Sequence, residues 1–227
     1  MGDHKGTSLQ IQKNKIMKPD LLVILFTMTL PYMAIANRFD THFRMLGLQG
    51  LLLFGVAFLK LYGHVSVANM GFILVETLVF KAILVPYFLF NIIKKNKIKR
   101  DFEVKKLSFY VIFTVLLIIV SSFVFAHQLN DEHLEINFFT ASISALLVGV
   151  LLIVIRKTII THIVGYLVLE NGIFLFSLAL GSEMPMIVNI GILLDLFTSV
   201  LLLGVFVNRI NEVFHTVEID TLTELKD

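Results

Sequence analysis

Residues 136–155 read INFFTASISALLVGVLLIVI, a stretch of twenty residues without one charged side chain. An α-helix rises about 1.5 Å per residue, so this stretch is about 30 Å long, which is the thickness of the hydrocarbon core of a bilayer. The run LSFYVIFTVLLIIVSSFVFA at residues 107–126 repeats the pattern on its N-terminal side. Together the two runs predict membrane-spanning helices joined by a short polar loop.

The same alternation of long apolar runs and short polar stretches continues in both directions along the chain. Of the 227 residues, 57% are hydrophobic and 16% are charged. No polar stretch approaches the roughly 40 residues below which a domain rarely folds alone, so a separate soluble catalytic domain is excluded. The sequence predicts an all-α, polytopic transmembrane helix bundle of about seven spans, at residues 21–36, 42–62, 67–93, 107–126, 136–155, 158–180 and 185–207.

These spans divide the chain into four parts. We expect a polar N-terminal segment (1–19), four helices (20–126), a C-terminal three-helix unit (136–208) and a polar tail (209–227). Ala34-Ile35-Ala36 follows a basic segment and an apolar run, so the first span could also be a signal peptide; we favour a retained helix.

The cysteine count and the placement of charge bear on cofactors and partners. The chain has no cysteine, which excludes a disulfide, a thiolate-bound iron–sulfur cluster and a covalently attached c-type haem. The histidines have no metal-ligand spacing, and the sequence has no Walker loop, dinucleotide fingerprint or Ser-His-Asp signature. We therefore expect no cofactor, no metal site and no enzymatic activity in this chain. Its net charge of +2 arises from basic residues beside the spans, which points to the lipid bilayer and not to nucleic acid.

The distribution of basic residues predicts the orientation in the membrane. Residues 94–106 hold seven Lys and Arg, whereas residues 127–137 hold none and carry three acids. By the positive-inside rule the first loop is cytoplasmic and the second lies outside. The N-terminus then lies outside too, in conflict with the four lysines of residues 1–19.

Four ionisable residues lie within the predicted spans. Lys81, Glu170 and Asp195 are near the middle of the third, sixth and seventh spans, and Glu76 also lies in the third. A charge at mid-membrane costs about 2.5 to 3.5 kcal/mol on insertion scales, so such a residue faces protein or water. On an α-helix Glu76 and Lys81 are about 140° apart, so we expect each to meet a neighbour on another helix.

These residues support two interpretations. Low-dielectric surroundings disfavour the charged forms of carboxylates and lysines alike, so a set of them can exchange protons as a relay. The alternative is that they form buried ion pairs that fix helix packing.

The sixth span adds a polar stripe. His162, Tyr166, Glu170 and Ser177 are spaced by four, four and seven residues, which places them on one helix face. They could carry a hydrogen-bonded path for protons. Alternatively Glu170 alone has a function, His162 is interfacial and the other two pack.

Three weaker signals concern helix shape and contact. Pro86 follows Lys81 by five residues and predicts a helix kink, which either opens a polar pocket or has no role. Gln49, with Gly47 and Gly50, predicts a helix–helix contact. Lys60 lies close enough to a span end to extend into the interface.

Three stretches resemble component E of hydrogenase 4, a membrane subunit of formate hydrogenlyase-type, complex I-related hydrogenases. They are TLVFKAILVP at 77–86, GYLVLENGI at 165–173 and GILLDL at 191–196. The last three predicted spans also resemble the K subunit of complex I. Asp195 matches one of the two membrane-embedded glutamates of that subunit, and Glu170 lies about one turn or more from the other.

The resemblance implies an accessory, non-catalytic subunit in a prokaryotic inner (cytoplasmic) membrane. Its neighbours would be antiporter-like membrane subunits, with a peripheral [NiFe] hydrogenase module attached through other subunits. The implied role is proton or sodium translocation, with Glu76, Lys81, His162, Tyr166, Glu170 and Asp195 as candidate relay residues. The alternatives are a purely structural assembly subunit and an independent small ion transporter.

Overall fold

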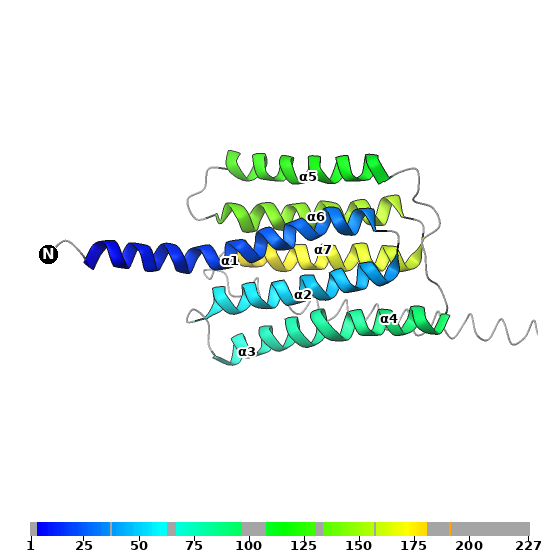
Figure 1. Ribbon diagram of the computed structural model, residues 1–227, viewed down its shortest axis with the longest axis horizontal. Coiled ribbons are helices and arrows are strands. Elements are labelled where there is room, and N and C mark those ends of the chain that lie inside the picture. Colours follow the sequence, from blue (N-terminus) through cyan, green and yellow to red (C-terminus); the bar gives the residue numbers. More distant parts are fainter. Residues whose placement is uncertain are drawn as a thin grey trace, which may run out of the picture.

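The computed structural model describes residues 4–36, 38–62, 67–96, 108–129, 134–156, 158–180 and 191. These residues form helices and contain no β-strand (Figure 1). In chain order the helices are α1 (His4–Ile35), α2 (Phe39–Leu61), α3 (Val67–Val75), the π-helix η1 (Glu76–Leu84), α4 (Val85–Asn96), α5 (Ser108–Gln128), α6 (Ile136–Ile155) and α7 (Ile159–Ala179). The predicted all-α class is confirmed.

Five of the helical stretches are long and apolar enough to cross a membrane. They are Phe39–Leu61, Met70–Asn91, Phe109–Gln128, Ile136–Ile155 and Ile160–Ala179, and the shorter apolar helix Pro19–Ile35 adds to them. The protein is thus a polytopic helix bundle, in which α6 has the bounds that the sequence predicted. The seventh predicted span, 185–207, lies outside the described residues apart from Gly191, as does the polar tail.

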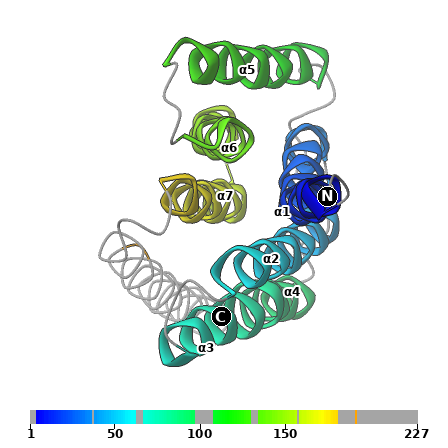
Figure 2. The same cartoon turned by 90° about the vertical axis from the view of Figure 1, so that its left-hand side faces the viewer.

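The helices stand side by side in two groups that meet at α1 and α2. In Figure 2, α5, α6 and α7 form a row, α1 flanks α6, and α3 and α4 lie beyond α2. The most extensive packing is between α6 and α7, while α2 contacts both η1 and α7. Consequently α2 connects the two stretches of chain that hold Glu76, Lys81 and Glu170.

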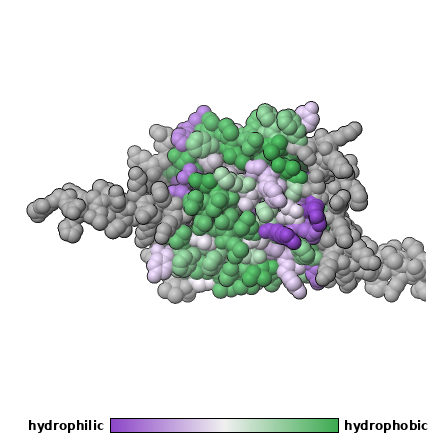
Figure 3. Space-filling model, viewed as in Figure 1, coloured by the Kyte–Doolittle hydropathy of each residue, from purple (hydrophilic) through white to green (hydrophobic). Residues whose placement is uncertain are grey.

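Burial is greatest in the middle of this arrangement. In the span Ile160–Ala179, 72% of an apolar 18-residue stretch is buried within the protein, compared with 22% in Phe109–Gln128. Large apolar side chains on the outer helix α5, such as Phe109 and Phe113, are exposed. Figure 3 shows the resulting surface, on which hydrophobic residues form a broad band and hydrophilic ones gather toward the helix ends. A surface of this kind suits contact with lipid.

Two polar contacts define the two ends of the bundle. Asn137 Nδ2 donates to Asp20 Oδ1 at 3.3 Å, which places the beginning of α6 beside the beginning of the apolar part of α1. At the opposite end Arg156 reaches the backbone at Ala34 and Ala36. The N-terminus of α1 lies at the opposite end of the bundle from the end of α4 and the beginning of α5 (Figure 1).

This arrangement permits a direct test of orientation, since the chain has no cysteine of its own. Arg38, whose side chain is 64% exposed, marks the same end as Arg156, and the exposed Gln128 marks the other. With the basic residues 94–106 inside, Gln128→Cys should react with an impermeant thiol reagent in intact cells. Arg38→Cys should react only after permeabilisation. The reverse labelling would contradict the predicted orientation, and the parent chain is the unlabelled control.

Candidate functional site

The π-helix η1 determines how Glu76 and Lys81 are placed. Its bonds connect residues five apart: the N–H of Val85, at its end, donates to the carbonyl of Phe80. Residues five apart on such a helix lie about one turn from each other, so Glu76 and Lys81 are on the same side. The prediction of different faces was wrong because it assumed α-helical geometry.

The π-helix ends at Leu84, two residues before Pro86. The helix continues without a break into α4, in which Pro86 is the second residue, and the predicted kink at Pro86 stays a prediction. The carbonyl of Ala82, four residues before Pro86, faces α2 at Gly47. A proline and a neighbouring helix thus border the π-helical stretch.

Glycines of α2 allow this close approach. A Cβ atom placed on Gly50 would lie 2.6 Å from the backbone nitrogen of Ala82 and 2.7 Å from the carbonyl carbon of Lys81. A Cβ on Gly47 would lie 3.3 Å from the oxygen of Ala82. The predicted role of these glycines in a helix–helix contact is confirmed, and their partner is η1.

Lys81 extends from η1 toward α7. Its Nζ lies 4.9 Å from the centroid of the Phe174 ring, a cation–π arrangement between the two helices. Glu170 lies four residues before Phe174 on the same face of α7 and is 3% exposed. Glu76 is similarly buried, at 4% exposed. The structure therefore places the lysine about one helical turn of α7 from a buried carboxylate.

A chain of buried hydrogen bonds lies beside Glu170. Asn171 Nδ2 donates to Gln49 Oε1 at 3.1 Å, and Gln49 Nε2 donates to Thr29 Oγ1 at 2.7 Å. Thr29 Oγ1 in turn donates to the carbonyl of Phe26 at 2.6 Å. These bonds connect α7, α2 and α1 through groups that do not titrate. The helix–helix contact predicted for Gln49 is confirmed. Thr29 and Asn171 were not predicted as its partners, although each is a polar residue within a span.

The polar residues predicted to form a stripe on α7 make different contacts. His162 Nε2 lies 2.6 Å from the carbonyl oxygen of Arg156, where its N–H donates, so His162 fastens the turn between α6 and α7. Ser177 Oγ donates to the carbonyl of Phe174 at 2.7 Å. Tyr166 is half-buried between His162 and Glu170 along the helix. The stripe thus contains backbone contacts at both ends, and Glu170 is its buried charge.

Arg156, which the sequence marked only as a topological charge, is 4% exposed. Its Nη2 donates to the carbonyls of Ala34 at 2.9 Å and Ala36 at 3.0 Å. Carbonyls at the end of a helix lack partners within that helix, so Arg156 satisfies the end of α1. No sequence pattern predicts this bond between distant residues.

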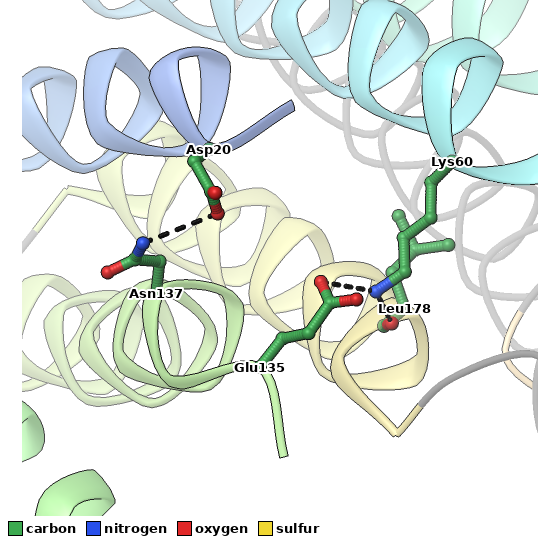
Figure 4. Close-up of polar contacts among 5 residues, drawn as sticks. All are labelled: Asp20, Lys60, Glu135, Asn137 and Leu178. Carbon is green, nitrogen blue, oxygen red and sulfur yellow. Dashed lines mark hydrogen bonds and ion pairs between the residues drawn. The ribbon is translucent and has the colours of Figure 1, made fainter. Parts of the chain in front are cut away.

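Lys60 turns into the protein at the other end of the bundle, contrary to the expected extension into the interface. Its Nζ lies 2.8 Å from Glu135 Oε2, donates to the carbonyl of Leu178 and lies 4.1 Å from the centroid of the Phe138 ring. The Lys60 side chain is 15% exposed and that of Glu135 is 50% exposed. One lysine thus joins α2 to the beginning of α6 and the end of α7 (Figure 4).

Two further observations concern metal binding and Asp195. Within the described ranges, no three His, Asp or Glu residues gather as a metal site would require. Asp195 lies outside the described residues. Its predicted place in the relay therefore stays a prediction.

Comparisons with known proteins connect part of the chain to a hydrogenase. It is 34% identical over 80 residues to hydrogenase-4 component E of Escherichia coli and of Shigella flexneri, covering 35% of this chain and 37% of theirs. It is 29% identical over 97 residues to an uncharacterized protein of Mycobacterium tuberculosis, covering 43% of this chain and 44% of the relative.

The chain spans less than half the length of the curated relatives that it matches. No protein-family model matches it, and no solved structure matches it. The apolar helices are those of a multi-pass membrane protein, and part of the sequence is similar to a hydrogenase-4 component.

Proposed function

We propose that this chain is a non-catalytic membrane subunit of a complex I-like, [NiFe]-hydrogenase-related energy-converting complex of the prokaryotic cytoplasmic membrane. In this complex it contributes to proton translocation beside antiporter-like membrane subunits, and other subunits attach the hydrogenase module. The similarity to hydrogenase-4 component E supports the kind of complex.

The observation that carries the proposed role is the placement of a lysine of η1 and a buried carboxylate of α7 at neighbouring positions on α7. Glu170 is buried on the most enclosed helix, and the ammonium group of Lys81 lies over Phe174, one turn away on the same face. Titratable groups of opposite type in a low-dielectric interior are suited to passing protons between them. Glu76, on the same side of η1 as Lys81, would extend this path, and Asp195 would continue it in the predicted seventh span.

Glu170→Gln tests this role because the amide keeps the size and much of the hydrogen bonding of the carboxyl group but cannot titrate near neutral pH. We expect the complex to assemble and its redox reaction with artificial acceptors to continue. Proton translocation in sealed vesicles should fall by at least about tenfold, as befits a lost proton-transfer group. Asp195→Asn should behave in the same way.

Ser177→Ala is the matched control, because it removes a buried hydroxyl of the same helix that donates to the carbonyl of Phe174. Translocation should be unchanged in this variant. If Glu170→Gln and Asp195→Asn retain full translocation, singly and combined, the proposed role is wrong.

A purely structural assembly subunit is the second candidate, and the hydrogen bonds among Asn171, Gln49 and Thr29 favour it, since they join three helices without a titratable group. Replacing both members of a charged pair by apolar residues is often neutral for stability. The double variant Lys81→Met with Glu170→Leu separates the two functions. A scaffold would keep coupled transport in this variant, whereas a relay would lose it.

A further inference from the structure

The ion pair of Lys60 and Glu135 lies at the boundary between the buried charges and the solvent. Figure 4 shows both side chains directed toward the end of α7, where Lys60 also meets the carbonyl of Leu178. Glu135 stands just before α6 and is half exposed, whereas Lys60 is largely covered. One partner of the pair therefore has access to water and the other has access to the interior.

Both lysines of the described spans contact α7. Glu170, Phe174 and Leu178 are four residues apart in succession, so they lie along one face of this helix. Lys81 lies over Phe174, and Lys60 bonds the carbonyl of Leu178. The two residues that they contact are thus one turn apart in α7, a rise of about 6 Å along the helix axis.

Exposure is greater at the end of the bundle than in its middle. Glu170 is buried, at 3% exposed as a residue. In the ion pair the Lys60 side chain is 15% exposed and the Glu135 side chain 50%. Titratable groups therefore lead from the middle of the bundle to the end that carries Asp20 and Gln128. Asp20 and Asn137 form a second polar contact at this end, but it joins α1 to α6 and lies away from the lysines (Figure 4).

We propose that Lys60 and Glu135 form the outer port of the proton path, a role that rests on the function proposed above. A proton moves from the Lys60 ammonium group to Glu135 Oε2, which leaves a neutral amine and a neutral carboxyl group. Glu135 releases the proton to water, and Lys60 takes up another from the side of Lys81. Uptake from outside follows the same steps in reverse.

Lys60→Arg distinguishes a port from a helix cap. Arginine keeps the positive charge, the hydrogen-bond donors and the cation–π contact, but it stays protonated. A cap would work with either residue, whereas a port requires loss of the proton. In the complete complex reconstituted in vesicles, we expect Lys60→Arg to preserve assembly, thermal stability and the redox reaction with artificial acceptors. Proton translocation should fall by at least about tenfold.

Asp20→Asn is the control for the same end of the bundle and should translocate normally. Glu170→Gln, measured in the same assay, separates the two proposals. If Glu170→Gln loses translocation but Lys60→Arg keeps it, the port is wrong and the proposed function stands. If both variants translocate normally, the proposed function fails as well. Equal losses in Asp20→Asn and Lys60→Arg would also overturn the port.

Glu135→Cys gives a second test that does not depend on the lysine. In this cysteine-free chain, a reagent that attaches a carboxyethyl group from outside restores a titratable acid at that position. A reagent that attaches a sulfonatoethyl group restores the negative charge without a group that takes up protons. We expect the unmodified variant to translocate poorly, the carboxyethyl adduct to recover and the sulfonatoethyl adduct to stay impaired. Equal recovery with both adducts would show that only charge matters, and would overturn the port.

Discussion

Alanine at Gly149 should prevent α6 from packing on α7 and should destabilise the protein by about 3 kcal/mol or more, at the upper end of what overpacking costs. A Cβ atom at this position would lie 2.7 Å from the carbonyl oxygen of Gly165 and 2.7 Å from the nitrogen of Leu169. Both atoms belong to backbone, so neither can turn aside and the helices must separate. A large fall in the melting temperature of the purified protein would show the effect.

The contact is reciprocal, which supplies a check within the same interface. A Cβ on Gly165 would lie 2.8 Å from the oxygen of Gly149, so Gly165→Ala should be comparably damaging. Within the part of the chain that the structure describes, no heavy atom outside the helix of Gly71 itself lies within 4 Å of the position of its Cβ. Gly71→Ala should therefore cause no loss of stability, and a native melting temperature for Gly149→Ala would contradict the close crossing.

Alanine at Gly50 should have an effect of similar size and should also impair translocation. Its Cβ would lie 2.7 Å from Cα of Ala82, so α2 must move away from η1 at the position next to Lys81. Separation there would displace the lysine from Phe174. We expect a lower melting temperature and, in material that still assembles, a loss of proton translocation of up to about a hundredfold, which misplacement of a reacting group by about 1 Å can cause.

Gly47→Ala is the graded comparison on the same helix face. Its Cβ would approach the oxygen of Ala82 to 3.3 Å, a contact that a small shift relieves. Its melting temperature should therefore lie between those of the parent chain and Gly50→Ala. Damage equal to or greater than that of Gly50→Ala would contradict the placement of α2 against η1.

The bounds of the apolar helices could be predicted to within a few residues because apolar length is a strong local signal, but α1 begins at His4, within the predicted polar segment 1–19. Residues 136–155 form α6 as predicted, and 158–180 differs from α7 by one residue at each end. The π-helix could not be predicted in this way. Residues 76–84 read ETLVFKAIL, and this pattern of six apolar and three polar residues does not distinguish a five-residue hydrogen-bond repeat from a four-residue one.

Some residues of the candidate site could likewise be predicted from the sequence, and others could not. Glu76, Lys81 and Glu170 are visible in the sequence because charged residues are rare within spans. The contacts of Lys60 and the chain from Asn171 to Thr29 join residues far apart in sequence, and many of their partners are backbone carbonyls, which every residue has. Their identification required the three-dimensional arrangement.

Arg156 has a consequence for the order in which the protein is made. The carbonyl of Ala34 receives its guanidinium partner from a residue 122 positions later. At about 5 to 20 residues per second, ribosomes need roughly 6 to 24 seconds to synthesise the intervening chain. During that time the end of α1 depends on water or lipid headgroups for its hydrogen bonds. In the newly made protein, the end of α1 therefore receives these hydrogen bonds only after α6 and Arg156 have been synthesised.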